Sequence, residues 1–330
     1  MKAIVQERFG PPDVLRLAEV DRPEPGPGQV LVRVRAAALN PYDWHLLRGD
    51  PYVARLMGAV GLTRPKSRVA GIDAAGEVEA VGSDVRGLRP GDEVLGFCPG
   101  SFAEYACTTA DLLVPKPARL GFEQAAALPM GAVTALRGIR TVGGARAGQR
   151  VLVNGAAGGV GTFAVQLAAG LGAEVTGVCS AGNTELVRSL GAAHVIDYAR
   201  EDFTEGRVRY DVILDNVGNR PLRRLRRALA PTGTLVANGG GSPGHVLGAV
   251  GSMLGVLATG VVVRRQRLKV ILPAAPDGPI HEDLSAVAAL VEAGELSPVV
   301  DRTYALADAA EGLRHLEGGH ARGKAVITVP

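Results

Sequence analysis

The stretch Val151–Gly161 reads Val-Leu-Val-Asn-Gly-Ala-Ala-Gly-Gly-Val-Gly, and it decides the fold of the second half of the chain. Three apolar residues run into a glycine-dense turn, and an apolar run from Val160 to Leu171 then predicts a helix. A strand, a glycine turn and a helix in this order aim free backbone N–H groups and the positive end of a helix dipole at one point, which suits a phosphate group. Ala156 stands at the first glycine position of the fingerprint Gly-x-Gly-x-x-Gly, so an ordinary tight turn stays the alternative on this segment alone.

The composition indicates a two-domain protein without a nucleic-acid partner. A chain of 330 residues is long enough for two domains, and its 47 % of apolar residues supplies two cores. A formal net charge of +3 leaves no concentrated basic surface for nucleic acid. The densest basic cluster, four arginines within residues 223–227, alternates with leucines at helical spacing and predicts the solvated face of an amphipathic helix.

The cysteines indicate a reducing compartment. Cys98, Cys107 and Cys179 form no Cys-x-x-Cys pair, so neither a zinc ribbon nor a dithiol redox motif is present in the sequence. An odd number of cysteines and an N-terminus that reads as a first strand rather than a signal peptide predict a cytoplasmic protein.

One apolar segment, Val246–Val263, carries no charge and is long enough to cross a membrane. It contains four glycines, however, and lies between segments that read as one α/β domain. We therefore predict a buried helix at the wall of a subunit interface or a substrate pocket, and no stable membrane insertion. Contact with a membrane surface stays the alternative.

The remaining pattern divides the chain into three parts. Residues 1–121 show short alternating strands broken by Pro and Gly, which predict a partly closed β-barrel. Residues 122–271 begin with two helices and then alternate strands and helices, which predicts a doubly wound parallel sheet. Residues 272–330 contain two helices and a last strand, Lys324–Val329, which we expect to return to the first part.

A series of motifs now resembles the medium-chain dehydrogenase/reductase superfamily, in its zinc-independent, quinone-oxidoreductase-like branch. The resemblance implies a GroES-like catalytic domain that is interrupted by a Rossmann dinucleotide-binding domain, with the active site in the cleft between them and a homodimer as the assembly. The motifs that carry it, in chain order, are Ala38–Asp43, Gly71–Gly76, Gly91–Val94, Ala103–Tyr105, Ala126–Pro129, Thr134–Leu136, Ala156–Gly161, Leu190–Ala192, Ile196–Tyr198 and Arg322–Lys324.

Zinc separates the branches of this superfamily. Zinc-containing relatives carry Cys where this chain has Asn40 and His where it has Ile72, and neither side chain can replace a thiolate or an imidazole on Zn²⁺. Without a Lewis acid, a simple ketone or alcohol is a difficult substrate, whereas an electron-poor acceptor takes hydride directly. We therefore predict a small hydrophobic acceptor, either a quinone or the activated C=C bond of an enone or enal.

The cofactor prediction is NADPH. An acid about 20 residues after the glycine turn normally binds the ribose of NAD, and here Ser180 and Asn183 occupy that region instead, although both are also good helix caps. The resemblance adds Tyr198 at the 2′-phosphate. It further implies that the pyrophosphate and nicotinamide contacts come from Thr134, Ala157, Gly158, Gly159, Val160, Gly161, Asn216, Gly239, Gly240, Arg322 and Lys324. For Lys324, a surface lysine that opens the last strand stays an equal alternative.

The candidate catalytic residues are Asn40, Tyr42 and His45. The amide of Asn40 can hold a carbonyl oxygen or a ribose hydroxyl, while Tyr42 and His45 are candidate proton donors, in competition with a proton from solvent. Two other functions stay open: a zinc-type alcohol dehydrogenase, which Asn40 and Ile72 disfavour, and an NADPH-binding sensor or scaffold with little turnover.

Overall fold

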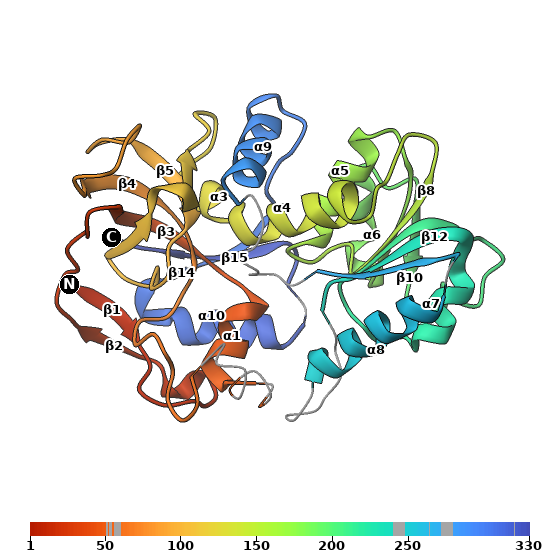
Figure 1. Cartoon of the computed structure of the whole chain (residues 1–330), viewed down its shortest axis with the longest axis horizontal. Coiled ribbons are helices and arrows are strands. Elements are labelled where there is room, and N and C mark those ends of the chain that lie inside the picture. Colours follow the sequence, from red (N-terminus) through yellow and green to blue (C-terminus); the bar gives the residue numbers. More distant parts are fainter. Residues whose placement is uncertain are drawn as a thin grey trace. The chain divides into compact units, whose positions relative to one another are not determined.

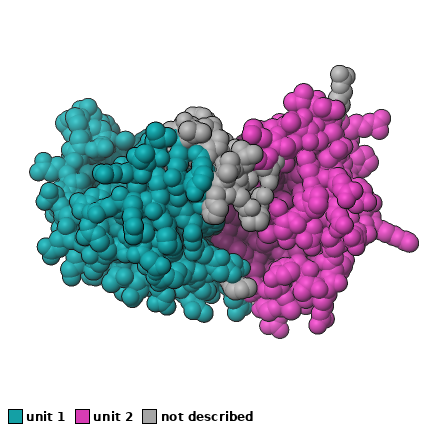
Figure 2. All heavy atoms as spheres, turned by 90° about the horizontal axis from the view of Figure 1, so that it is seen from below, with its two compact units in different colours: residues 1–133, 276–330 teal, residues 134–275 magenta. Residues whose placement is uncertain are grey.

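The computed structural model describes residues 1–50, 52, 55, 61–239, 248–263, 265–271, 280–319 and 321–330. The chain forms two compact units: unit 1 comprises Met1–Val133 and Pro276–Pro330, and unit 2 comprises Thr134–Ala275 (Figure 2). The sequence placed the divisions after residues 121 and 271. In the structure residues 122–133 belong to unit 1, because helix α3 (Phe122–Ala126) packs against the sheet of that unit.

Unit 2 contains a six-stranded parallel sheet with the order β10-β9-β8-β11-β12-β13. Counted along the chain from β8, this order is 3-2-1-4-5-6, which confirms the predicted doubly wound, Rossmann-type fold. The winding direction reverses between β8 and β11. The strands are β8 (Arg150–Asn154), β9 (Glu174–Cys179), β10 (His194–Asp197), β11 (Tyr210–Asp215), β12 (Leu229–Ala237) and β13 (Arg267–Val270).

Helices cover both faces of this sheet. Figure 1 shows α5 on one side and α7 and α8 on the other, as expected when right-handed crossovers wind outward from a central strand in both directions. The helices of unit 2 are α5 (Gly161–Gly170), α6 (Thr184–Ser189), α7 (Leu222–Ala228) and α8 (Gly248–Val262), and α4 (Pro129–Leu136) runs from unit 1 into unit 2.

How deeply a strand is buried explains whether it could be predicted from the sequence. Val151, Leu152 and Val153 of β8 are completely buried, so this strand reads as a continuous apolar run. Strand β13 lies at the edge of the sheet, and among its residues Leu268 is the buried one. The alternation of charged and apolar residues in β13 could have indicated a strand. The strand is only four residues long, however, and it was not predicted from the sequence.

Unit 1 is built on a mixed sheet with the order β14-β15-β3-β4-β5-β7, in which β6 also pairs with β3. Strand β15 pairs antiparallel with the end of β3, with Ala325 opposite Leu39, which confirms the predicted return of the last strand. Strand β14 was not predicted. The strands are β1 (Lys2–Val5), β2 (Arg16–Glu19), β3 (Gln29–Leu39), β4 (Asp73–Val81), β5 (Glu93–Phe97), β6 (Tyr105–Thr109), β7 (Leu113–Pro115), β14 (Val300–Ala305) and β15 (Lys324–Thr328), and the further helices are α1 (Pro41–Arg48), α9 (Ile280–Glu292) and α10 (Ala309–Glu317).

The apolar helix α8, predicted at the wall of a subunit interface or a substrate pocket, leaves several side chains uncovered in the single chain. The sequence favoured a buried helix over Val246–Val263, but the structure exposes several of its side chains, namely Leu254, Leu257, Val261 and Val262. The helix packs on β13 with one face only, so a segment that is apolar all round leaves part of its surface uncovered. Among the described residues, no helix has the length and apolar character to span a membrane.

Candidate active site

The glycine turn after β8 lies where the winding of the sheet reverses, the usual ligand position in such sheets. Gly155 has a φ of +78°, which an L side chain rarely adopts. A Cβ atom at Gly161 would lie 2.0 Å from the carbonyl oxygen of Gly155, so only glycine allows α5 to begin here. At Gly158 an added Cβ would make an ordinary contact with the Gly155 carbonyl oxygen at 3.5 Å, so a methyl group fits there without a clash.

The other predicted residues of this turn have graded exposure. Ala157 is buried, whereas Gly158, Gly159 and Val160 are half-buried. The backbone of the turn therefore reaches the surface at its middle, where a phosphate would meet it.

A polar network joins the carboxyl ends of β8, β11 and β12. Asn154 donates from Nδ2 to Asp215 Oδ1 at 2.8 Å, and that oxygen also accepts the backbone N–H groups of residues 217 and 218. Asn216 donates to the carbonyl oxygen of Asn154 at 3.1 Å and accepts from Asn238 Nδ2 at 2.8 Å. The structure thus brings the predicted Asn216 to the edge of the sheet that carries the glycine turn.

Three members of this network, Asn154, Asp215 and Asn238, were missed from the sequence. Their signal is positional, because each is a polar residue at or just after the carboxyl end of a buried strand. Of the other predicted residues of unit 2, Thr134 is buried. Gly239 has a φ of +117° and lies next to Asn216. Gly240, also predicted, lies outside the described residues.

The candidate 2′-phosphate residues follow β9 and β10, which are neighbours in the sheet. Asn183 donates from Nδ2 to Ser180 Oγ at 3.1 Å, and both residues are half-buried. The Tyr198 side chain is half exposed, and its backbone N–H donates to the Cys179 carbonyl oxygen at 3.2 Å. An acid does lie at this edge: Asp197 is opposite Cys179 and forms an ion pair with Arg200 at 3.6 Å.

In unit 1, Asn40 lies between the end of β3 and the first residue of α1, and it is buried. Its Nδ2 donates to the Ala38 carbonyl oxygen at 3.3 Å and to Asp73 Oδ2 at 3.1 Å, and its Oδ1 accepts from Lys324 Nζ. Its backbone N–H donates to Asp43 Oδ2 at 2.7 Å. The amide of Asn40 is therefore held on both sides by charged groups.

Asp43, Asp73 and Lys324 form a buried charged cluster around Asn40. Lys324 Nζ lies 3.5 Å from Asp73 Oδ2, which also accepts the Met130 backbone N–H at 3.2 Å. Burial and the neighbouring Asp73 carboxylate raise the pKa of Asp43 to about 7, and burial raises the pKa of Asp73 while Lys324 opposes that rise. One oxygen of each carboxylate, Oδ1, has no hydrogen-bond partner.

This cluster excludes one of the two alternatives for Lys324, the surface lysine. The lysine is 4 % exposed, so it is not a surface residue, and its ammonium contacts Asn40 and Asp73. Strand β15 places it there by pairing with β3. Arg322, by contrast, is exposed.

The two candidate proton donors lie on α1 beside this cluster. The Tyr42 side chain is half-buried, and burial together with Asp43 raises its pKa. The His45 ring stacks on Trp44 with a centroid separation of 3.8 Å; burial lowers its pKa, and its Nδ1 atom makes no hydrogen bond. Among the described residues, no hydrogen bond joins either side chain to Asn40, Asp73 or Lys324.

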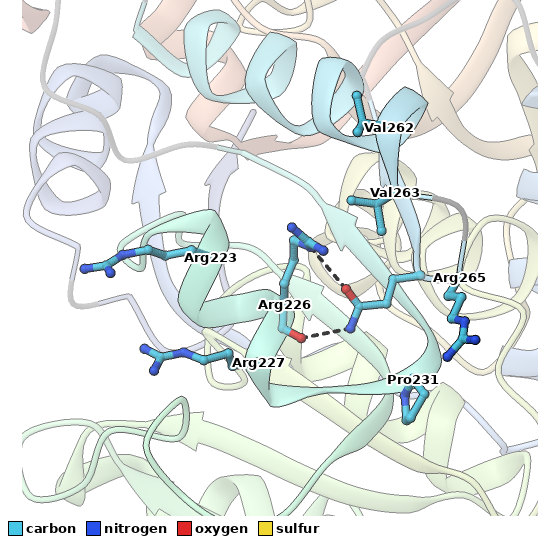
Figure 3. A pocket seen from close by; sticks show the side chains of 8 residues that line it. Arg223, Arg226, Arg227, Pro231, Val262, Val263 and Arg265 are labelled. Atoms are coloured by element: carbon cyan, nitrogen blue, oxygen red, sulfur yellow. Dashed lines mark hydrogen bonds between the residues drawn. The ribbon is translucent and has the colours of Figure 1, made fainter.

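Two further observations bear on ligands. In the part of the chain that the structure describes, no group of three or more His, Cys, Asp or Glu side chains is arranged to hold a metal ion. A hollow of about 700 Å³ lies on unit 2 and shares no residue with the site described above. Figure 3 shows that its arginines do not converge on one point, since Arg223 and Arg227 point to one side and Arg265 to another.

Comparisons with known proteins agree with this geometry. The family model for the alcohol dehydrogenase GroES-like domain matches residues 26–118, and the one for zinc-binding dehydrogenases matches residues 190–327. The chain is 34 % identical to the mitochondrial NAD(P)H oxidoreductase RTN4IP1 of Bos taurus, over 100 % of this chain and 89 % of the relative. It is also 34 % identical to the 2-methylene-furan-3-one reductase of Solanum lycopersicum, over 99 % and 79 % of the two chains.

Among solved structures, the quinone oxidoreductase of Coxiella burnetii superposes with a TM-score of 0.86 at 32 % identity, covering 100 % of this chain and 99 % of the other. Fold, motifs and relatives thus agree over the whole chain, which belongs to the medium-chain dehydrogenase/reductase superfamily, in its quinone-oxidoreductase-like branch.

Proposed function

We propose that this protein is an NAD(P)H-dependent oxidoreductase that transfers hydride, without zinc, to a quinone or to the activated C=C bond of an enone or enal. The observation that carries the proposal is the Asn40–Asp73–Lys324 cluster, in which the buried ammonium group of Lys324 contacts Asn40 Oδ1 and Asp73 Oδ2 and puts a positive charge where the zinc-containing relatives bind their metal. The names of relatives support the reaction class, since they include an NAD(P)H oxidoreductase, a furanone reductase and a quinone oxidoreductase.

A dinucleotide fits the glycine turn of unit 2. The half-buried Gly158 has no side chain to keep a pyrophosphate from the backbone, and the N-terminus of α5 directs N–H groups toward the same place. Asn154, Asp215 and Asn216 would fix the loops on the other side of the switch point. When bound, the reduced nicotinamide supplies the hydride.

Within this proposal, NADPH is preferred to NADH. Ser180 and Asn183 offer hydrogen-bond donors at the end of β9, and the half-exposed Tyr198 stands on the neighbouring strand end. Asp197 is the acid nearest to this group, but Arg200 and the Ala199 backbone N–H engage its carboxylate. An acid paired in this way repels a 2′-phosphate less than a free one does.

Zinc does not fit the residues of unit 1. Asn40 Oδ1 accepts from Lys324, and Ile72 offers only an alkyl side chain. The positive charge of Lys324 also repels a dication at the same place. Without a Lewis acid a simple ketone is a more difficult acceptor, which favours an acceptor that is already electron-poor.

The test measures oxidation of NADPH and of NADH against a 1,4-quinone, an enal, an enone and a simple ketone, with metal content determined on the same sample. We expect turnover with the quinone or the enal and enone, higher kcat/KM with NADPH, and activity that survives a chelator. Turnover of the ketone alone, with about one zinc per chain lost together with activity, would refute the proposal. Binding of NADPH without turnover of any acceptor would favour a sensor or scaffold.

We also propose a homodimer formed through unit 2. The exposed apolar side chains of α8 support it, because such a surface on one chain is a natural place for a second copy. Changing Leu257 and Val261 together to Glu is expected to give a monomer by light scattering, whereas Leu62→Glu, an exposed leucine of unit 1, is expected to leave the dimer intact. A wild-type protein that is monomeric at micromolar concentration contradicts the proposal.

The three free thiols suit a reducing compartment, and within this proposal that compartment is the cytoplasm. Relatives are named as mitochondrial or chloroplast proteins, so recovery of the native protein from an organelle fraction would count against it.

A further inference from the structure

The arginines in and before helix α7 fall into two groups with different surroundings. Arg220 and Arg224 lie 3.0 and 3.3 Å from Asp202 Oδ2, so a carboxylate compensates their charge. Arg223 and Arg227 are exposed, and neither forms an ion pair with a described residue. They are four residues apart on one side of the helix, where like charges repel each other. The uncompensated pair indicates a negatively charged partner.

The hollow on unit 2 extends this positive surface. Its lining comes from α7, the start of β12, the end of α8 and the segment before β13. Of the described residues that line it, none is Asp or Glu and four are arginines, namely Arg223, Arg226, Arg227 and Arg265. Gln266 holds Arg226, since it accepts from the Arg226 Nε at 3.1 Å and donates to the Arg226 carbonyl oxygen at 2.9 Å. The other three arginines have no hydrogen-bond or ion-pair partner among the described residues.

The directions of these side chains favour an extended partner over a single small anion. Figure 3 shows Arg223 and Arg227 on one side of the hollow and Arg265 on another. One phosphate group cannot contact all three, whereas a layer of separate phosphates can. The planar guanidinium group binds phosphate with two parallel hydrogen bonds, and its aliphatic stem can lie against an apolar layer at the same time.

Apolar side chains lie between the arginines. Val262 is 79 % exposed, and it lines the hollow together with Val263 and Pro231. Successive residues of a helix are turned by about 100°, so Val262 lies on a different side of α8 from Leu257 and Val261, which are proposed for the dimer.

The kind of apolar side chain separates two anionic partners. Sites for single-stranded nucleic acid stack the bases on aromatic rings, and no described residue in the lining of the hollow is aromatic. Aliphatic side chains next to arginines instead suit the boundary between the headgroups and the acyl chains of a lipid bilayer. Charge complementarity and the aliphatic residues therefore both favour an anionic lipid surface.

We propose that Arg223, Arg227 and Arg265, which we call the arginine surface, dock the protein reversibly on a bilayer of anionic phospholipids, with Val262 at the acyl boundary. A basic residue near such a bilayer strengthens binding about fivefold, and salt screens the attraction. Anionic lipids face the cytoplasm in cell membranes, which agrees with the compartment proposed above. The inference concerns unit 2 alone, and it does not depend on the proposed reaction.

The first experiment measures co-sedimentation of the whole protein with two kinds of vesicle, one of phosphatidylserine and phosphatidylcholine in equal parts and one of phosphatidylcholine alone. We expect binding to the mixed vesicles only, and its loss in concentrated salt. Arg227→Glu is expected to weaken this binding at least about tenfold, because an attraction becomes a repulsion.

The matched control is Arg188→Glu. It makes the same change of charge at an exposed arginine of unit 2, but on α6, which packs on β9 and β10 at the other end of the sheet. This variant is expected to bind the mixed vesicles as the wild type does. Both substitutions are at exposed positions, so both proteins are expected to keep the wild-type thermal midpoint.

A third variant, Val262→Ser, tests the apolar contact. It is expected to weaken binding to the mixed vesicles about threefold, since one aliphatic side chain no longer enters the boundary layer. Equal vesicle binding by Arg227→Glu and Arg188→Glu would overturn the proposal, as would a wild-type protein that does not bind the mixed vesicles. Binding of a labelled DNA duplex without binding of vesicles would also overturn it and would assign the arginine surface to nucleic acid.

Discussion

Changing Gly161 to alanine is expected to destabilise unit 2 by about 3 kcal/mol or more and to abolish binding of the dinucleotide. The added Cβ atom would lie 2.0 Å from the Gly155 carbonyl oxygen and 2.8 Å from the backbone of Ala156. Both are backbone atoms of the turn that follows β8, so neither can move aside as a flexible side chain would. The measurement is the thermal midpoint by circular dichroism, together with NADPH binding.

Gly158→Ala is the matched comparison in the same turn. The nearest atom to its Cβ is 3.5 Å away, and Gly158 lacks the positive φ found at Gly155, so this variant is expected to keep the wild-type thermal midpoint. Its methyl group fills the space in front of the turn, and NADPH affinity is expected to fall about 10- to 100-fold as hydrogen bonds to the charged phosphates are lost. Equal thermal midpoints for Gly161→Ala and the wild type would refute the steric account. NADPH binding by Gly158→Ala as tight as that of the wild type would show that the phosphates do not bind at this turn.

Changing Asp73 to alanine is expected to lower the free energy of unfolding of unit 1 by about 3–5 kcal/mol, because it leaves a buried ammonium without its ion-pair partner. It also removes the acceptor for Asn40 Nδ2 and for the Met130 backbone N–H. The chain has one tryptophan, Trp44, and it lies in unit 1, so urea unfolding followed by its fluorescence reports on this unit.

The control for this prediction is Asp111→Ala, an exposed carboxylate of the same unit, which is expected to change stability by less than about 0.5 kcal/mol. Asp73→Asn should lie between the two, since it keeps an acceptor oxygen but loses the charge. If Asp73→Ala were as stable as Asp111→Ala, then Asp43 would be sufficient as the counter-ion of Lys324, and the cluster would not depend on Asp73.

The fold was predictable where the signal is local. Strand β8, the turn at Gly155–Gly161 and helix α5 are adjacent in sequence. A short window of the sequence therefore shows the buried apolar strand, the glycines of the turn and the apolar helix together. Strand β13 was missed because an edge strand of four residues buries little, and the exposed side chains of α8 could not be predicted because apolar composition does not say which neighbour covers a helix.

The candidate site divides in the same way. Asn40 and Ile72 could be recognised by residue type, since an amide and an alkyl group exclude a zinc ligand set wherever they lie. Asn154, Asp215 and Asn238 gained meaning only when three strand ends were brought to one edge of the sheet.

By itself, the sequence determined the glycine turn, the parallel sheet of unit 2, the family resemblance and the residues at Asn40 and Ile72, because each is carried by a few neighbouring residues or by residue type. Only the tertiary structure decided that Lys324 is buried and that its ammonium group donates to Asn40, 284 positions away in the chain. The reason is physical: whether a lysine is buried depends on a partner that compensates its charge, and here that partner, Asp73, arrives through the pairing of β3 with β4 and β15.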